Sequence, residues 1–298
     1  FWLKASWPGG SFRPGRDWGC EARDGPSTSS AAPALTPGME VPVSFFQPTP
    51  KGESDELETE WGREERLEHT FPSGIRYTGQ WLGQEPNGEG YQVWPDGRTY
   101  RGEFRGGKAE GLGTFEYANG SIYVGPWLKD MAHGKGMCTL ADGSIYQGEW
   151  QNGKQHGQGT LTLPDGTMFV GQYREGAKSG VGTVAYAGEK AGCSYKGEFL
   201  ADAFHGQGVY IWDDGRRYDG QWKNSKMHGH GQFSFADGRR YEGQYVDGEK
   251  NGKGTYEWPD GRMYKGEVFR GKQHGTGVYT DAKGRRKKGE WSLGKFVG

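Results

Sequence analysis

The chain is short of cysteine, of long hydrophobic runs and of net charge, and each shortage argues against a class of protein. Three cysteines among 298 residues, Cys20, Cys138 and Cys193, match neither a disulfide framework nor the spacing of a thiolate metal site. Sparse cysteine is typical of a reducing compartment, which favours a cytoplasmic location. No stretch approaches the roughly 20 apolar residues of a membrane-spanning helix, and no secretory signal is evident. A formal net charge of −1 disfavours nucleic-acid binding.

Hydrophobic residues are also few, and this shortage by itself would favour disorder. They make up 32% of the chain, and the mean hydropathy is −0.92. However, aromatic residues reach 14%, and the 56 glycines recur in register with them. Repeats of this kind bury a few large rings against their neighbours instead of building one thick core. The composition is therefore compatible with a folded repeat protein.

Internal repetition with a period of 23 residues fills three quarters of the chain. Phe169 keeps the period between two blocks of tyrosines, and an insertion of three residues near Gly188 lengthens the following step to 26. This gives nine full repeats, and a partial tenth begins at Lys287. The tyrosines that open the other eight repeats are Tyr77, Tyr100, Tyr123, Tyr146, Tyr195, Tyr218, Tyr241 and Tyr264.

The pattern within a repeat predicts a β-hairpin. Tyr100, Gly102 and Phe104 share one parity, so on a strand they lie on one face, and the glycine leaves bare backbone on which a ring can rest. Asn119-Gly120 and its equivalents predict tight two-residue hairpin turns with positive φ. At about 9.5 Å per hairpin, nine repeats predict an all-β, elongated, single-layer antiparallel ribbon of about 85 Å.

The repeat resembles the MORN repeat (membrane occupation and recognition nexus), whose YxGxW…GxGxxxxxxG core is nearly intact from Tyr146 to Gly166. The resemblance covers residues 77–298 and implies a MORN-only solenoid. Three positions depart from the pattern. Pro126 is expected to interrupt the first strand of the third repeat because it lacks an N–H donor, Val268 replaces an aromatic residue, and Lys287 replaces the opening tyrosine of the tenth repeat.

The segments before the repeats are read from composition. Residues 1–52 are rich in Gly, Pro and Ser and are expected to be a disordered linker, within which Met39 is a candidate initiator. Residues 53–76 are expected to form an acidic segment and an N-terminal cap. The stretch from 53 to 69 suggests a short helix that packs Leu57, Trp61 and Leu67 on the first hairpin, although Gly62 weakens this interpretation.

Motifs that suggest chemistry are better explained by the repeat itself. Five histidines share one repeat position, which we interpret as turn chemistry because equivalent positions about 9.5 Å apart cannot converge on one zinc ion. Strings such as GEWQNGKQ from Gly148 match part of a phosphate-binding loop but lack its Ser/Thr and its helix. We therefore expect no enzyme activity, no cofactor and no metal. The histidines are His133, His156, His205, His228 and His274.

Charge separates the two ends of the chain. Residues 39–99 carry 5 Lys and Arg against 12 Asp and Glu, whereas residues 195–298 carry 19 against 14. Two features of the C-terminal end become candidate contacts. The densest basic run could bind anionic lipids or a partner, and two rings of the partial tenth repeat could form a terminal docking edge. The basic run is Arg285, Arg286, Lys287 and Lys288, and the rings are Trp291 and Phe296.

Two functions remain open. The resemblance implies a structural scaffold that binds protein partners in cytoskeletal, ciliary or membrane-associated assemblies, and a homodimer through the C-terminal end. The alternative is a module that binds phosphoinositides or other acidic phospholipids, as MORN repeats do beside phosphatidylinositol phosphate kinases, with the catalytic domain absent. The sequence identifies neither the partner nor the organelle.

Overall fold

The computed structural model describes residues 62–298, and most of this part is β-strand. One short 3₁₀ helix, η2 (Gly188–Lys190), occupies the three-residue insertion. The first eleven strands are β1 (Arg63–Thr70), β2 (Arg76–Leu82), β3 (Glu85–Val93), β4 (Thr99–Arg105), β5 (Lys108–Glu116), β6 (Ile122–Leu128), β7 (Met131–Ala132), β8 (Gly134–Thr139), β9 (Ile145–Gln151), β10 (Lys154–Thr162) and β11 (Met168–Arg174). The others are β12 (Ala177–Ala185), β13 (Ser194–Leu200), β14 (Ala203–Ile211), β15 (Arg217–Lys223), β16 (Lys226–Ser234), β17 (Arg240–Val246), β18 (Glu249–Glu257), β19 (Met263–Phe269), β20 (Lys272–Thr280), β21 (Arg286–Ser292) and β22 (Lys295–Phe296).

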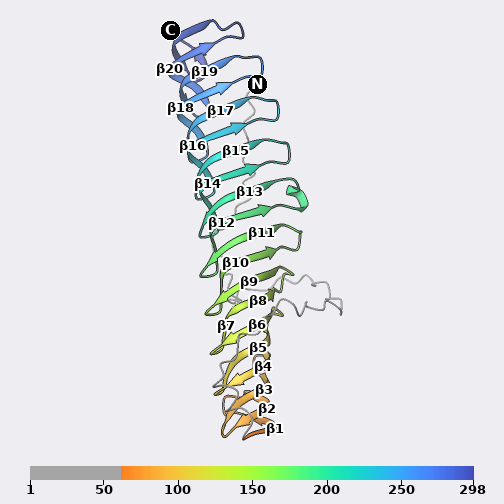
Figure 1. The fold of residues 1–298 in the computed structure, drawn as a ribbon. Helices are drawn as coiled ribbons and strands as arrows, with labels where there is room; N and C mark the ends of the chain where they lie inside the picture. The colour runs from red at the N-terminus through yellow and green to blue at the C-terminus, as the bar shows by residue number, and fades with distance from the viewer. Residues whose placement is uncertain (1–61) are drawn as a thin grey trace.

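The 22 described strands form one antiparallel sheet in which each strand pairs with its neighbours along the chain. The hairpins stack into a long, twisting ribbon with β1 at one end and β22 at the other (Figure 1). Repeats therefore contact only adjacent repeats, as in other solenoids. The expected fold, an elongated hairpin ribbon in a single layer, is confirmed.

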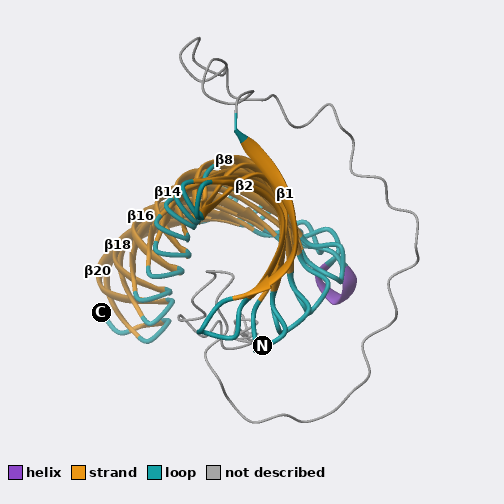
Figure 2. Ribbon diagram, turned by 90° about the horizontal axis from the view of Figure 1, so that it is seen from below, coloured by secondary structure: helices purple, strands orange, loops and turns teal. Residues whose placement is uncertain are grey.

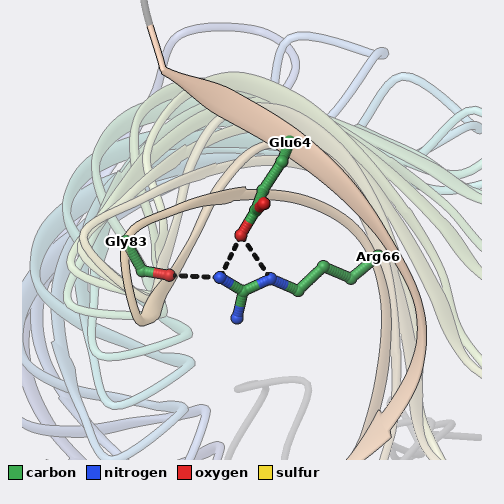
Figure 3. A network of polar contacts seen from close by, with 3 residues as sticks. All are labelled: Glu64, Arg66 and Gly83. Carbon is green, nitrogen blue, oxygen red and sulfur yellow. Dashed lines mark hydrogen bonds and ion pairs between the residues drawn. The ribbon is translucent and has the colours of Figure 1, made fainter.

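The sheet is curved as well as twisted, so it forms a trough when viewed along its length (Figure 2). Figure 3 shows Glu64 and Arg66 of β1 reaching into the inside of this curve. Glu64 pairs directly with Trp81, and the Arg66 guanidinium lies 4.8 Å from the centre of the Trp81 ring. Because paired residues share a face, the aromatic face is the concave face of the trough.

A tyrosine resting on two paired glycines is the core of each repeat. Gly148 on β9 faces Gly159 on β10, and Tyr146 lies over both. A Cβ atom added to Gly159 would lie 2.6 Å from the Tyr146 Cε2 atom. The Tyr146 hydroxyl donates a hydrogen bond of 3.0 Å to the carbonyl of Glu149, and the residue is fully buried. Only glycine leaves room for a ring this close to the backbone.

A β-bulge beside each glycine pair bends the hairpin. In β10 the register shifts between His156 and Gly159, and Gly157 takes a φ of +56°. The Glu149 carboxylate accepts a hydrogen bond of 3.2 Å from the N–H of Gln158, which lies within this shift. A bulge increases local bend and twist, and its recurrence at one level of the stack curves the whole sheet. The side chains that accept the same bond elsewhere are Gln80, Glu103, Gln172, Glu198, Gln221, Gln244 and Glu267.

The tight two-residue turns lie at the end of the hairpin opposite to the predicted one. Asn152 and Gly153 both have positive φ, of 50° and 77°, as a type I′ turn requires. At Asp142-Gly143 only the glycine has positive φ, and the turn is closed by a hydrogen bond from the N–H of Gly143 to the carbonyl of Leu140. The prediction of two-residue turns at the Asp-Gly and Asn-Gly dipeptides is therefore wrong. These dipeptides form wider turns in which Asp or Asn caps a backbone N–H.

The expected interruption at Pro126 falls on the opposite strand. β6 runs continuously through Pro126, whose carbonyl accepts hydrogen bonds from the Tyr123 hydroxyl and from the N–H of His133. In other repeats the Glu or Gln at this position accepts a hydrogen bond from a backbone N–H at the bulge through its side-chain oxygen. Proline has no such oxygen. The partner strand consequently divides into β7 and β8 around His133.

The expected helix over residues 53–69 is wrong for the part that the structure describes. Arg63–Thr70 forms β1, which pairs with β2, and Leu67 is 91% exposed instead of packed. Arg66 covers the Trp81 ring, binds Glu64 and donates to the carbonyl of Gly83 at 2.7 Å (Figure 3). This strand caps the first repeat. Residues 1–61, including the expected linker, Leu57 and Trp61, lie outside the described residues.

Replacing Gly148 with valine should strongly destabilise the fold. The new Cβ would lie 2.6 Å from the carbonyl oxygen of Gln158 and from the Cα of Gly159, so backbone must move. We expect a loss of about 3 kcal/mol or more in the free energy of unfolding. Lys154→Ala, which removes an exposed ion pair with Glu175, should change it by less than about 0.5 kcal/mol. Urea unfolding measures both, and equal losses would show that the glycine frame is wrongly assigned.

Replacing Glu149 with alanine should destabilise the bulge. The variant removes the acceptor of the Gln158 N–H, and because this hydrogen bond is exposed to water its loss should cost about 0.5–1.5 kcal/mol. Gln147→Ala on the same strand is the matched control because it spares the bulge. Amide hydrogen exchange should accelerate at Gln158 in the first variant only. Unchanged exchange at that amide would contradict the assigned role.

Candidate functional site: two interaction surfaces

The concave face carries a ladder of rings that joins each repeat to the next. The opening aromatic residue of one repeat contacts the third-position ring of the following repeat edge to face, with ring centres 5.0–5.5 Å apart. Such contacts contribute about 0.5–1.5 kcal/mol each beyond the area they bury. The pairs are Tyr77–Phe104, Tyr100–Trp127, Tyr123–Trp150, Tyr146–Tyr173, Phe169–Phe199, Tyr195–Trp222, Tyr218–Tyr245 and Tyr264–Trp291.

The ladder has one gap among these repeats, where Tyr241 would meet residue 268. Val268 is buried at that position and supplies no ring. Tyr241 instead contacts Tyr256 of its own repeat, with ring centres 4.6 Å apart. The departure from the repeat pattern at Val268 thus removes one inter-repeat ring contact from the concave face.

A second row of side chains lies across the hairpin from the third-position rings. Lys178 pairs with Tyr173, and Lys250 occupies the equivalent place opposite Tyr245. Lys178 has its counter-ion in the next repeat, because its Nζ lies 3.6 Å from Oδ1 of Asp202. The other members of the row in complete repeats are Pro86, Ala109, Ala132, Gln155, Phe204, Met227 and Gln273.

Lys250 lies in an aromatic cage without a counter-ion. Its Nζ lies between 4.6 and 5.2 Å from the ring centres of four aromatic residues, and it makes no ion pair within residues 62–298. Burial, and to a smaller extent the nearby Arg239, lower the pKa of Lys250 to about 7. The cage residues are Phe233, Phe235, Tyr241 and Tyr256.

The row of histidines lies beside the bulges and not in the turns. Nδ1 of His228 accepts a long hydrogen bond of 3.5 Å from the N–H of Asp247, and His274 does the same with Leu293. The interpretation as turn chemistry is therefore wrong for the four histidines on strands, of which His228 and His274 reach toward the next repeat, whereas His133 lies between β7 and β8. Within the described residues no three His, Cys, Asp or Glu side chains are grouped as a metal site.

The basic run at the C-terminal end is exposed, and its members differ in what they contact. Arg285 forms an ion pair with Asp281, with Nε 2.7 Å from Oδ2. The Lys287 ammonium lies 3.5 Å from the centre of the Phe296 ring. Arg286 and Lys288 are exposed on β21. The run therefore does not act as one unit, because two of its four cations already have neighbours.

The two candidate docking rings lie together, with centres 5.0 Å apart, but only Phe296 is accessible. Trp291 packs against Tyr264 and is 6% exposed, whereas Phe296 is 39% exposed. β22 and the last residues pair with part of β21, through Trp291 and Ser292 and through backbone bonds to Glu290. The edge that sequence reasoning treated as wholly unpaired is thus open only from residue 286 to 289 within the described chain.

Two further hollows within residues 62–298 are open to solvent and are not confined to the concave face. Shallow hollows lie along β14 to β18, and one of them is lined by His228, Gln244, Tyr245 and Asn251. Cys138 and Cys193 are buried and form no disulfide within the described residues. No helix within residues 62–298 is long and apolar enough to cross a membrane.

The profile of the MORN repeat matches nine segments between residues 77 and 284, and the chain therefore belongs to the MORN-repeat family. MORN repeats form protein-interaction modules and are generally non-catalytic. The nine matched segments are 77–97, 100–122, 123–145, 146–168, 169–188, 195–216, 218–239, 241–261 and 264–284. No curated protein sequence matches the chain.

Solved structures show only distant likeness. The TCP10 domain of CPAP from Danio rerio is 13% identical, with a TM-score of 0.27, and the match covers 78% of this chain and 98% of that one. The TCP domain of SAS-4 from Drosophila melanogaster, solved with a proline-rich motif of Ana2, is 10% identical with a TM-score of 0.24. That match covers 88% of this chain and 99% of the other. At these values the likeness carries no functional argument.

Sequence reasoning missed the caged lysine. The sequence does contain a signal for it. Lys250 is the second residue of its strand, and the equivalent position in other repeats is occupied mainly by apolar residues and Gln. Finding it required the register across the bulge, which places residue 250 opposite Tyr245. Without that register the lysine resembles the many exposed lysines at nearby turn positions.

Proposed function

We propose that the chain is a non-enzymatic assembly protein that binds other proteins and associates with a second copy through its C-terminal end. The observation that carries the proposal is the open edge of β21. Residues 286–289 pair with β20 on one side only, and the half-exposed Phe296 lies beside them. Unpaired strand edges next to exposed rings are sites where another chain can add a strand.

The setting that we propose is a cytoplasmic scaffold in a cytoskeletal, ciliary or membrane-associated assembly. The long ribbon supports this function because it presents surface over many repeats and encloses no reaction chamber. Separated partners could bind different repeats of one ribbon and so be held at fixed spacing.

Binding of anionic phospholipid is the second candidate. Arg286 and Lys288 support it because both are exposed and neither makes an ion pair with any described residue. Each cation near an anionic leaflet contributes about 1 kcal/mol, so two of them give a weak, salt-sensitive attachment. We rank it second because Arg285 and Lys287 already have neighbours.

Reversing two charges on the open edge should weaken self-association by about tenfold, the effect of 1.4 kcal/mol. The test variant is Arg286→Glu with Lys288→Glu, and the control is Lys253→Glu with Lys265→Glu on interior strands. Sedimentation velocity over a range of concentrations should show dimers of the parent and the control, and monomers of the test variant. A deletion from Arg285 onward is less informative because it also uncovers Tyr264.

A parent chain that remains monomeric at all concentrations would contradict the proposal, as would equal association of both variants. Co-sedimentation with phosphatidylserine vesicles distinguishes phospholipid binding, the second candidate, from self-association. Binding that the test variant loses and the control keeps would favour the lipid function, whereas no binding by the parent would reject it.

A further inference from the structure

The cage at Lys250 lacks the counter-ion of the equivalent site at Lys178, and its ammonium lies near four rings where that of Lys178 lies near one, Phe169. The backbone geometry is shared, since the N–H of Asp202 donates to the carbonyl of Lys178 at 3.1 Å and the N–H of Gly271 donates to the carbonyl of Lys250 at 2.9 Å. Asp202 has a φ of 66° and Gly271 a φ of 75°. Where the first lysine meets a carboxylate from the next repeat, the second meets a glycine with no atom within 4 Å of its missing Cβ.

The surroundings of Lys250 favour an anion that comes from outside the repeat. Four ring faces hold the ammonium but supply no full negative charge. Arg239, which stacks 4.8 Å from the centre of the Phe235 ring and pairs with Asp237, adds positive potential. The gap in the ring ladder at Val268 lies in the same part of the groove. A buried cation without a counter-ion is costly, and a carboxylate that reached it would offset this cost.

We propose that the concave groove at Lys250 binds a carboxylate side chain from an acidic segment of a partner protein, in the place that Asp202 fills at Lys178. This inference rests on the proposed function as a protein-interaction module. It adds the site on the ribbon and the chemistry of the partner. A carboxylate fits better than a phosphate because the chain itself uses a single Asp at the equivalent position, against a single lysine.

The concave side of the curved sheet continues along the repeats (Figure 2), so an extended acidic segment could lie along it and place one Asp or Glu at the cage. The acidic run at residues 53–60 of the same molecule is excluded, because it joins β1 at the opposite end of the ribbon. Its few residues span at most about 3.5 Å each, whereas seven repeats of about 9.5 Å separate Tyr77 from Tyr241. This acidic run therefore cannot reach the cage, and the occupant that we propose is a segment of another molecule.

The test measures binding of a fluorescein-labelled hexaglutamate peptide by fluorescence anisotropy to the full chain and four variants. Lys250→Met should weaken binding by about tenfold or more, as expected for loss of a charge-assisted contact. Met227 already occupies the equivalent position, so this side chain fits. Lys253→Met, which removes an exposed charge from the same strand, should leave binding within about twofold of the parent.

Gly271→Asp restores the internal counter-ion and should block the site. Peptide binding should fall by about tenfold, and the midpoint of thermal unfolding should rise as the ion pair forms. Gly271→Asn matches it in size and tolerance of positive φ but lacks the charge, so binding should persist. Competition with inorganic phosphate identifies the ligand chemistry: displacement by phosphate at concentrations where acetate is ineffective would overturn the assignment to a carboxylate.

The proposal is overturned if the parent does not bind hexaglutamate, or if Lys250→Met and Gly271→Asp bind it as tightly as the parent. It is also overturned if Lys253→Met loses as much affinity as Lys250→Met, since binding would then follow net charge. These outcomes are independent of the edge of β21. Self-association in sedimentation can therefore succeed or fail separately from peptide binding.

Discussion

A phenol ring lying on two facing glycines is the contact on which the ribbon depends. In the fourth repeat Tyr146 covers Gly148 and Gly159 so closely that neither position tolerates a Cβ. The same ring contacts Tyr173 of the next repeat at 5.1 Å, so one side chain closes its own hairpin and binds its neighbour. Because each repeat provides only this small core, stability is the sum of repeated local contacts.

Much of this could be predicted from the sequence. The period, the shared face of Tyr, Gly and the third-position ring, and the hairpins follow from alternation and from glycine placement, and the structure confirms them. The curvature could not be predicted in the same way. It depends on a bulge at Gly157 and on the Glu149 carboxylate that accepts the displaced amide, and a pattern of alternation does not reveal a change of register. The positions of the two turn types could not be predicted either. Composition places a tight two-residue turn at Asp142-Gly143, but positive φ at both residues occurs at Asn152-Gly153 instead, and Asp142 does not adopt it.

The candidate sites lie where the repeat is imperfect. Val268 leaves a gap in the ring ladder, Gly271 withholds a counter-ion, and β22 pairs with only part of β21. The sequence identified the basic run and the final rings, but the contact between Lys287 and Phe296 depended on the short return strand β22. A protein built from near-identical units marks its binding positions by such departures, because regular repeats offer the same surface everywhere.

The tyrosines that open the repeats are buried hydrogen-bond donors, and we expect the fold not to survive their ionisation. Burial raises the pKa of Tyr77 to about 12, and burial likewise raises the pKa of Tyr146 well above its usual range. Since these pKa values are raised in the folded state, their contribution to stability is fully present below about pH 10 and is lost as pH increases further. Ultraviolet titration of the phenols, with circular dichroism recorded on the same samples, tests this directly. We expect the tyrosines that open the repeats to ionise only together with loss of the β signal; ionisation of all 16 tyrosines of the chain near pH 10, with the β signal intact, would contradict this expectation.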